Sequence, residues 1–308
     1  MHGLLDHRLV FVTGKGGVGK STVATAIGLL AARRGLRTIV AELSSQDRIQ
    51  RAFDREVAQF EEVELAPGLS TISIDPQHAM EEYLRVKAGP LGSALGQSRL
   101  FGVFAMATPG MRELLTIGKV WELAQLHRRT RGAAPYDLVI VDAPATGHGV
   151  GLLRTPRTFA EIALVGPIAA QANAIAATIA DRAFTGVVAV CTAEEMPVNE
   201  TIELNDELAG DGLGLDLVIV NAVYPDRFDG AEAEQLAAVA VSSESSGTRG
   251  AVRAALSEHA RAQTHAAQRA RLTEELAAPV ITLPYVFGEE LGRGELEALA
   301  DALQDATR

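Results

Sequence analysis

The segment from residue 14 to residue 21 limits the possible folds of this chain more than any other feature. It reads Gly14-Lys15-Gly16-Gly17-Val18-Gly19-Lys20-Ser21 and fits the phosphate-binding loop pattern G-x-x-x-x-G-K-[ST]. The run Leu9-Val10-Phe11-Val12 before it predicts a buried strand, and Ser21 to Arg34 behind it predict a helix. A plain glycine-rich turn is the alternative. The strand–loop–helix context favours a loop whose backbone N–H groups and helix dipole hold a phosphate.

Each residue type in this loop has a chemical reason. Glycines let backbone N–H groups close around a β-phosphate, where side chains would intrude. Lys20 is expected to reach the β- and γ-phosphates, and the Ser21 hydroxyl is expected to ligate Mg²⁺. The loop therefore predicts a nucleotide and Mg²⁺. The expected nucleotide-binding residues of this segment are Gly14, Lys15, Gly16, Gly17, Val18, Gly19, Lys20, Ser21 and Thr22.

A second buried strand ends in a carboxylate. Asp137-Leu138-Val139-Ile140-Val141-Asp142 is followed by Ala143-Pro144-Ala145-Thr146-Gly147-His148. Phosphoryl-transfer sites need a second acid near Mg²⁺ and a glycine N–H that senses the γ-phosphate, and Asp142 and Gly147 suit these roles. We expect Asp142 to hold Mg²⁺ through a water molecule. An aspartate at a strand end can also cap a helix, and a histidine in an exposed loop, such as His148, needs no role.

Apolar runs that predict strands alternate with helical patterns along the chain, which is typical of a parallel sheet with helices on both faces. We expect one domain over residues 1–308, an α/β fold with a mostly parallel sheet of about seven strands. The expected strands are Leu9–Val12, Thr38–Ala41, Leu69–Ile74, Leu138–Val141, Gly186–Cys191, Leu217–Val220 and Val280–Leu283. Residues from about 224 to 278, rich in Ala, Glu, Gln and Arg, predict a helical insertion outside the sheet.

Composition argues against several classes of function. The net charge of −11 disfavours a broad electrostatic grip on nucleic acid or anionic lipid. Cys191 is the only cysteine, which excludes a disulfide framework and a thiolate zinc site within one subunit. The N-terminus lacks a signal-peptide pattern, so we expect a cytoplasmic protein. The uncharged stretch Ile162–Ala180 approaches the length of a membrane span, but its proline and amide residues favour a helix packed against the sheet or a partner.

Several motifs resemble one family in combination. Lys15 inside the loop resembles the deviant Walker A lysine of the MinD-like, dimeric P-loop ATPases. The segment from Asp142 to His148, followed by Leu152-Leu153 and Pro156, is similar to the Asp-Thr-Ala-Pro-Thr-Gly-His segment of the arsenical-pump and tail-anchored-protein-targeting ATPases, the ArsA/Get family. Segments 109–113 and 194–201 also resemble that family. The chain is identified as a divergent, actinobacterial-like member, and the resemblance extends from about residue 8 to residue 300.

The resemblance implies an ATPase that uses ATP and Mg²⁺ and works as a dimer, with two subunits enclosing two nucleotides. Lys15 would cross the interface and stabilise charge on the phosphates bound by the facing subunit. Glu194 and Asn221 would hold the nucleoside, and Pro284 would lie near the base. A protein or membrane-protein client is the implied partner, and nucleic acid is not. The implied catalytic residues are Lys15, Lys20 and Asp142.

Three departures from the family pattern limit what can be carried over. The zinc-binding cysteine pair and the arsenite-binding cysteines are absent, so we expect no zinc. The interval between Pro156 and Gly186 is too short for the large methionine-rich subdomain of eukaryotic members, and core packing explains Met106 and Met111. Ser44 takes the place of the aspartate that orients the attacking water, and a serine hydroxyl cannot act as a carboxylate base.

The segment around Ser44, which we call the first switch, leaves open which residue would orient the attacking water. Glu42 or Asp47 could substitute outside the expected register, whereas Asp75-Pro76-Gln77-His78 looks like the missing motif but follows the third strand. The leading interpretation is an ATP-dependent dimer, formed by two copies or with a paralogous ATPase, that acts on a protein partner. One alternative is a nucleotide-gated scaffold with little intrinsic ATPase activity. The other is a partitioning ATPase similar to MinD and ParA, which the acidic charge disfavours.

Overall fold

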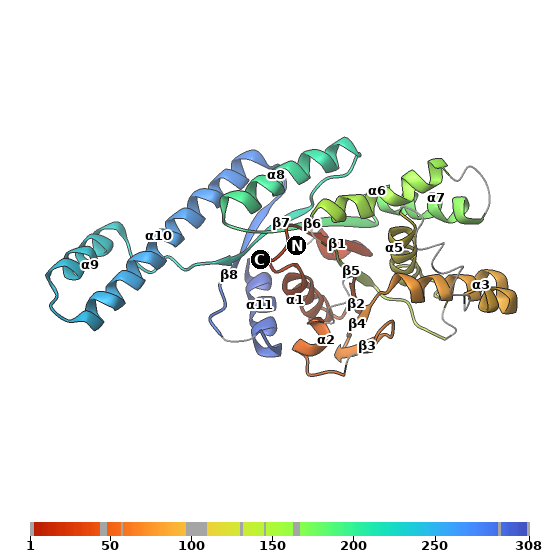
Figure 1. Cartoon of the computed structure of the whole chain (residues 1–308), viewed down its shortest axis with the longest axis horizontal. Helices are drawn as coiled ribbons and strands as arrows, with labels where there is room; N and C mark the ends of the chain where they lie inside the picture. The colour runs from red at the N-terminus through yellow and green to blue at the C-terminus, as the bar shows by residue number, and fades with distance from the viewer. Residues whose placement is uncertain are drawn as a thin grey trace.

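Eight strands form one sheet among the residues that the computed structural model describes, which are 3–43, 48–56, 58–96, 110–129, 132–144, 146–162, 167–288 and 291–306. The strands are β1 (Leu9–Thr13), β2 (Thr38–Glu42), β3 (Val63–Ala66), β4 (Leu69–Ser73), β5 (Leu138–Asp142), β6 (Thr185–Thr192), β7 (Leu217–Val223) and β8 (Val280–Pro284). Their order is β3-β4-β2-β5-β1-β6-β7-β8 (Figure 1). All neighbours are parallel except β3 and β4. The carboxyl ends of the parallel strands therefore meet at one edge of the sheet.

Helices cover both faces of this sheet (Figure 1). Their bounds are α1 (Lys20–Arg33), α2 (Arg48–Ala52), α3 (Pro76–Gly96), α5 (Met111–Leu123), α6 (Thr146–Ile162), α7 (Pro167–Ala180), α8 (Glu195–Gly210), α9 (Gly230–Ser242), α10 (Ser246–Glu275) and α11 (Arg293–Asp305), with a 3-10 turn at Leu4–Asp6. Ile27 of α1 and Leu299 of α11 are buried on one face with Val10 of β1. The other face carries α5, α6, α7 and α8. Strand side chains are thus buried on both sides, as a doubly covered sheet requires.

The predicted α/β fold class is confirmed, and the seven expected strands correspond to β1, β2, β4, β5, β6, β7 and β8. Strand β7 continues further than expected, to Val223. Strand β3 was not predicted. It lies at the sheet edge with Leu65 buried and Glu64 exposed, and so lacks the continuous apolar run that marks a strand buried on both faces.

The stretch predicted to be a helical insertion contains α9 and α10, which form a hairpin that extends away from the sheet (Figure 1). Asp229 and Ser245 supply the N-caps of the two helices. Helix α9, all of which the structure describes, has no buried residue. Near the end of α10, Leu272 is buried and Arg271 donates to Asn199 Oδ1 of α8 at 2.5 Å. The hairpin is therefore anchored through the C-terminal end of α10.

Residues 167–180 of the uncharged stretch form α7, which packs on the sheet. Ala172, Ile175 and Ile179 are buried in the core on that face, in agreement with the expected packed helix. Residues 163–166 lie outside the described part of the chain. None of the helices within the described ranges is both long and apolar enough to cross a bilayer.

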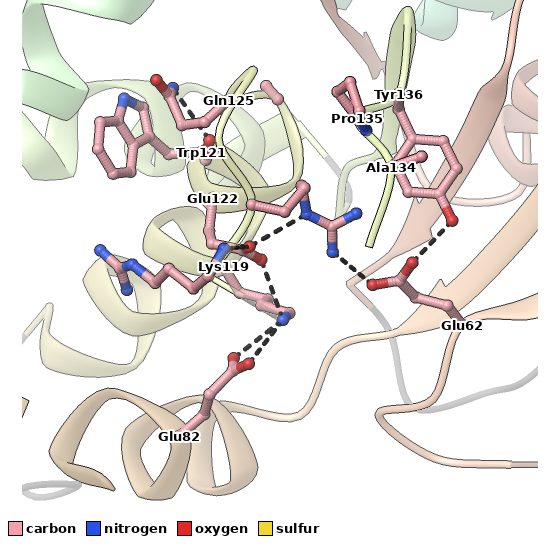
Figure 2. A network of polar contacts seen from close by, with 12 residues as sticks. Glu62, Glu82, Lys119, Trp121, Glu122, Gln125, Ala134, Pro135 and Tyr136 are labelled. Carbon is pink, nitrogen blue, oxygen red and sulfur yellow. Dashed lines mark hydrogen bonds and ion pairs between the residues drawn. The ribbon is translucent and has the colours of Figure 1, made fainter. Parts of the chain in front are cut away.

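A group of charged side chains, buried except at Glu62 and Glu82, joins the edge of the sheet to α3 and α5, and Figure 2 shows its contacts. We call it the ionic network, and its members are Glu62, Glu82, Lys119, Glu122, Arg128 and Tyr136. Lys119 Nζ lies 2.9 Å from Glu82 and 3.1 Å from Glu122. Arg128 reaches Glu122 at 3.0 Å and Glu62 at 2.5 Å, and the Tyr136 hydroxyl donates to Glu62 at 2.8 Å.

The ionic network favours the charged form of its carboxylates. The side chain of Arg128 is fully buried, and that of Glu122 is 2% exposed. Burial alone would raise the pKa of Glu122, but Lys119, the Arg129 N–H and Arg128 outweigh it and hold this pKa below its usual value. Buried charges are tolerated when each is paired in this way.

Candidate functional site

The loop after β1 requires glycine at two positions. Gly14 has a φ of 145°, and a Cβ atom there would lie 2.1 Å from the carbonyl oxygen of Val190. Gly19 has a φ of 91°, and its Cβ would lie 2.3 Å from Asn221 Nδ2. A larger residue at either position would be strained and would clash. The loop is therefore packed closely against β6 and β7, with no room for side chains on that side.

Lys20 begins α1 and folds back over the loop. Its Nζ donates to the carbonyl oxygen of Lys15 at 2.9 Å, which closes the loop. Burial lowers the pKa of Lys20, while Asp142 opposes this shift and Arg48 adds to it. The charge of the ammonium is thus only partly compensated by the protein, and a phosphate group would stabilise it.

Asp142 ends β5 beside the start of α1, where it is 4% exposed. Its Oδ2 accepts a hydrogen bond from Ser21 Oγ at 2.5 Å. Burial raises the pKa of Asp142 to about 6, although Ser21, Lys20 and Arg48 act in the opposite direction. A hydroxyl and a carboxylate are oxygen ligands of the kind that Mg²⁺ prefers, and a divalent cation would favour the ionised carboxylate. The donor set therefore fits the expected metal.

Most of the predicted phosphate-binding residues line one cavity, which we call the phosphate cavity. Its volume is about 660 Å³, which lies within the usual range for ligand sites of about 300–1,000 Å³. Arg48 of α2 also lines it, and this residue was not predicted because no pattern in the sequence marks it. The predicted residues on the wall are Gly16, Gly17, Gly19, Lys20, Ser21, Thr22 and Asp142.

Asn221 lies beside the loop, and its Nδ2 donates to the carbonyl oxygen of Val18 at 2.9 Å. The amide that was expected to hold the nucleoside therefore also fixes the loop. The next residue, Ala222, has a φ of 56° where the pairing of β7 with β8 is irregular. A positive φ is uncommon outside glycine and indicates local strain at this end of β7.

Glu194 lines a second cavity, of about 710 Å³, together with Tyr285, the residue after Pro284. Tyr285 stacks on Tyr224 with ring centroids 4.7 Å apart, and the Arg261 guanidinium of α10 lies 5.7 Å from the Tyr224 ring centre. Stacked aromatic rings beside a cation suit a planar aromatic ligand. The structure thus brings Glu194 and the segment after Pro284 together, in a cavity separate from the one that holds the loop residues.

Gly147 lies in the first turn of α6, the helix whose Leu152 and Leu153 are buried in the core. Its role as a sensor of the γ-phosphate stays a prediction. Several residues singled out from the sequence lie outside the described residues: Ser44, Asp47, Met106, Pro109 and Ala145.

Two other acidic residues near the first switch have structural contacts. Glu42 is fully buried at the end of β2, where its Oε1 accepts from the Arg48 N–H at 3.0 Å. Asp75 Oδ1 accepts from the backbone N–H groups of Gln77 and His78 at 2.9 and 3.0 Å. Asp75 therefore caps the start of α3.

The side chain of Lys15 points towards α8 of the same chain. Its Nζ lies 2.5 Å from Oε1 of Glu200 on α8. In the sequence, Glu200 is only one residue of the segment 194–201 that resembles a family motif. No local pattern could have paired two residues that are 185 positions apart.

Comparison with known proteins shows the family of this chain. The model of the anion-transporting ATPase family, ArsA, matches residues 7–165 and 161–240. ATPase BagA of Mycobacterium tuberculosis is 33% identical over 231 residues, which are 72% of this chain and 67% of BagA. An arsenical pump-driving ATPase of Acidiphilium multivorum is 26% identical over 241 residues, which are 73% of this chain and 40% of that protein. ATPase GET3 of Komagataella phaffii is 25% identical over 251 residues, which are 69% of this chain and 72% of GET3. The chain therefore belongs to the ArsA/Get family of anion-transporting ATPases.

Proposed function

We propose that this chain binds ATP with Mg²⁺ in the phosphate cavity and hydrolyses it. The proposal rests above all on the meeting of Lys20, Ser21 and Asp142 at one cavity beside a glycine cradle. Lys20 and the loop N–H groups would hold the β- and γ-phosphates, and Ser21 and Asp142 would hold Mg²⁺. The metal, when bound, neutralises charge that develops on the phosphates.

Family membership supports an ATP-dependent dimer that acts on a protein or membrane-protein client. The names of two relatives, an arsenical pump-driving ATPase and ATPase GET3, describe ATPases. In the proposed dimer, Lys15 reaches the phosphates bound by the facing subunit, which is either a second copy or a paralogous ATPase. A single cation supplied in this way can raise the rate of phosphoryl transfer by roughly 10³-fold or more.

Calorimetry with ATP, with and without Mg²⁺, tests the binding step. We expect Lys20→Ala to abolish detectable binding, because it removes the charge that the loop places between the phosphates. Ser21→Ala should keep the nucleotide contact but weaken its dependence on Mg²⁺. Lys15→Ala is the matched control, since it removes a lysine of the same loop that does not line the cavity. Near-normal affinity in Lys20→Ala would contradict the proposal.

A scaffold with little intrinsic activity is the second candidate, and one observation favours it. Asp142 is the only carboxylate among the described residues that line the phosphate cavity, and its proposed role is to hold Mg²⁺. A turnover assay on the purified chain, alone and with a paralogous ATPase from the same cell, separates the candidates. Slow turnover alone and fast turnover with the paralogue, lost in Lys15→Ala, would support a heteromeric enzyme. Brisk turnover of the pure chain would favour a self-sufficient ATPase, and no turnover in either case would favour the scaffold.

A further inference from the structure

The contact between Lys15 and Glu200 bears on how the proposed dimer is controlled. The two side chains are 34% and 27% exposed, and the distance between Nζ and Oε1 is 2.5 Å. The backbone of Lys15 is fixed independently, because its carbonyl oxygen accepts the hydrogen bond from Lys20. The ion pair therefore determines only where the Lys15 ammonium points.

Glu200 belongs to a part of α8 that other contacts hold in place. Thr201 next to it is buried. Asn199 on the other side accepts a hydrogen bond from Arg271 of α10 at 2.5 Å. A lysine side chain is long and flexible, with an ammonium that can exchange partners. Lys15 can therefore swing outward while Glu200 stays where it is.

We propose that Glu200 is a positioning residue that holds Lys15 in its own subunit until a nucleotide-loaded second subunit competes for it. This inference rests on the proposed dimeric ATPase. A lysine ammonium pairs with a carboxylate or with a phosphate, and a triphosphate carries more negative charge than one carboxylate. Because the pair is partly exposed, it is weak. It favours the inward position of the Lys15 ammonium over the outward position by only about 2- to 5-fold. Such a restraint disfavours premature association and is still weak enough for a phosphate to displace.

The first test measures the ion pair in the nucleotide-free chain. Acylation of the Lys15 amine, followed by mass spectrometry, is compared in the wild type, Glu200→Gln and Glu203→Gln. Glu203 is the matched control because it is an exposed glutamate on the same helix. We expect Lys15 to react about 2- to 5-fold faster in Glu200→Gln only, with buried Lys119 as internal reference. Equal rates in all three proteins would overturn the inference and leave the proposed ATPase untouched.

The second test measures release of Lys15. Sedimentation velocity with Mg²⁺ and a non-hydrolysable ATP analogue reports association of two subunits. Glu200→Gln should associate about 2- to 5-fold more tightly than the wild type, and Glu200→Asp should restore wild-type behaviour. In a Lys15→Ala background, Glu200→Gln should have no further effect. This last result separates restraint of Lys15 from a general change in α8.

Two outcomes would count against the inference in different ways. If Glu200→Gln weakens association as Lys15→Ala does, Glu200 supports the assembled state and does not restrain Lys15, and the inference is wrong. If the wild-type chain binds the analogue but associates neither with itself nor with the paralogous ATPase, the proposed dimer fails, and the release of Lys15 fails with it. The latter result is obtained on the wild type alone, so the two failures can be told apart.

Discussion

The phosphate cavity and the ionic network both place basic side chains beside carboxylates, but they compensate these charges in opposite ways. In the network, Arg128 contacts two carboxylates, and the surrounding cations hold the pKa of Glu122 below its usual value. In the cavity, burial lowers the pKa of Lys20 and raises that of Asp142 to about 6. The fold thus favours the charged forms in the network and disfavours them in the cavity.

This difference indicates which group of charges is set up for a ligand. A buried set that is already balanced contributes to the stability and uniqueness of the fold. A set that the protein leaves unbalanced stores unfavourable free energy, and a ligand that balances it recovers that free energy on binding. For the phosphate cavity, a triphosphate with a divalent cation would balance both Lys20 and Asp142. Substitutions in the two regions should therefore change the free energy of unfolding in opposite directions.

The largest expected effect is a loss of stability in the ionic network. Glu122→Gln keeps the shape of the side chain but leaves Lys119 and Arg128 each with one carboxylate fewer. Removing one partner of a buried ion pair costs about 3–5 kcal/mol, and we expect about 3 kcal/mol because Glu82 and Glu62 remain. Urea unfolding followed by circular dichroism measures the change.

The control for this prediction is Glu113→Gln, an exposed glutamate in the first turn of the same helix. Its loss should cost no more than about 1 kcal/mol, through the helix dipole. Equal losses in both variants would mean that the network contributes nothing beyond an ordinary surface charge, and the contrast between the two regions would disappear.

The second prediction is a gain of stability in the cavity. The folded chain raises the pKa of Asp142 from 3.8 to about 6, so the protonated carboxyl stabilises the folded state. This contribution to the free energy of unfolding is fully present below pH 3.8 and is lost as the pH rises through 6. Above pH 6, Asp142→Asn should therefore stabilise the nucleotide-free chain, by about 2 kcal/mol at pH 8. Near pH 4 the variant and the wild type should unfold at nearly the same urea concentration.

Mg²⁺ and ATP should reverse the sign of this effect. The wild type should gain thermal stability with both ligands at pH 8, whereas Asp142→Asn should gain little from Mg²⁺ because the carboxylate that would hold it is gone. A thermal shift assay at fixed ligand concentration measures both. If Asp142→Asn is less stable than the wild type at pH 8 without ligand, Asp142 is a structural residue like Glu122, and the comparison is wrong.

The smallest change in the free energy of unfolding should come from Tyr136, at the Glu62 end of the ionic network. Tyr136→Phe removes the hydroxyl that donates to Glu62 at 2.8 Å, while Arg128 still pairs with that carboxylate. We expect a loss of about 1.5 kcal/mol, the lower end of the usual range for a hydrogen bond to a charged group. ATP and Mg²⁺ should not change this cost. A ligand-dependent cost would mean that the network and the cavity are coupled.

The local parts of the site could be predicted, and the contacts between distant segments could not. The loop is contiguous, and Asp142 ends an unbroken apolar strand, so pattern and context point to both. The bond from Asn221 to Val18 joins residues 203 positions apart, and the pair of Lys15 and Glu200 joins residues 185 apart. Such contacts follow from the order and register of the strands, which a single sequence does not reveal.

The ionic network was missed for a related reason. Its glutamates and basic residues belong to types that are mostly exposed in proteins, and they are scattered over several elements. Glu62 and Arg128 are 66 positions apart, so only the packing of α3 and α5 against the sheet edge brings them together. Glu62 itself directly precedes the unexpected strand β3, so no predicted element placed it at the sheet edge.

The hairpin of α9 and α10 has a mechanical consequence. Its fixed end is joined to α8, and its other end lies far from the sheet (Figure 1). At a rise of 1.5 Å per residue, the helix between Ser246 and His265 extends about 28 Å, so a tilt of about 10° at His265 moves the far end by about 5 Å. His265 lines the same cavity as Glu194 and Tyr285. The hairpin therefore has the geometry of a lever, and a small rotation of α10 beside this cavity would be amplified at the tip.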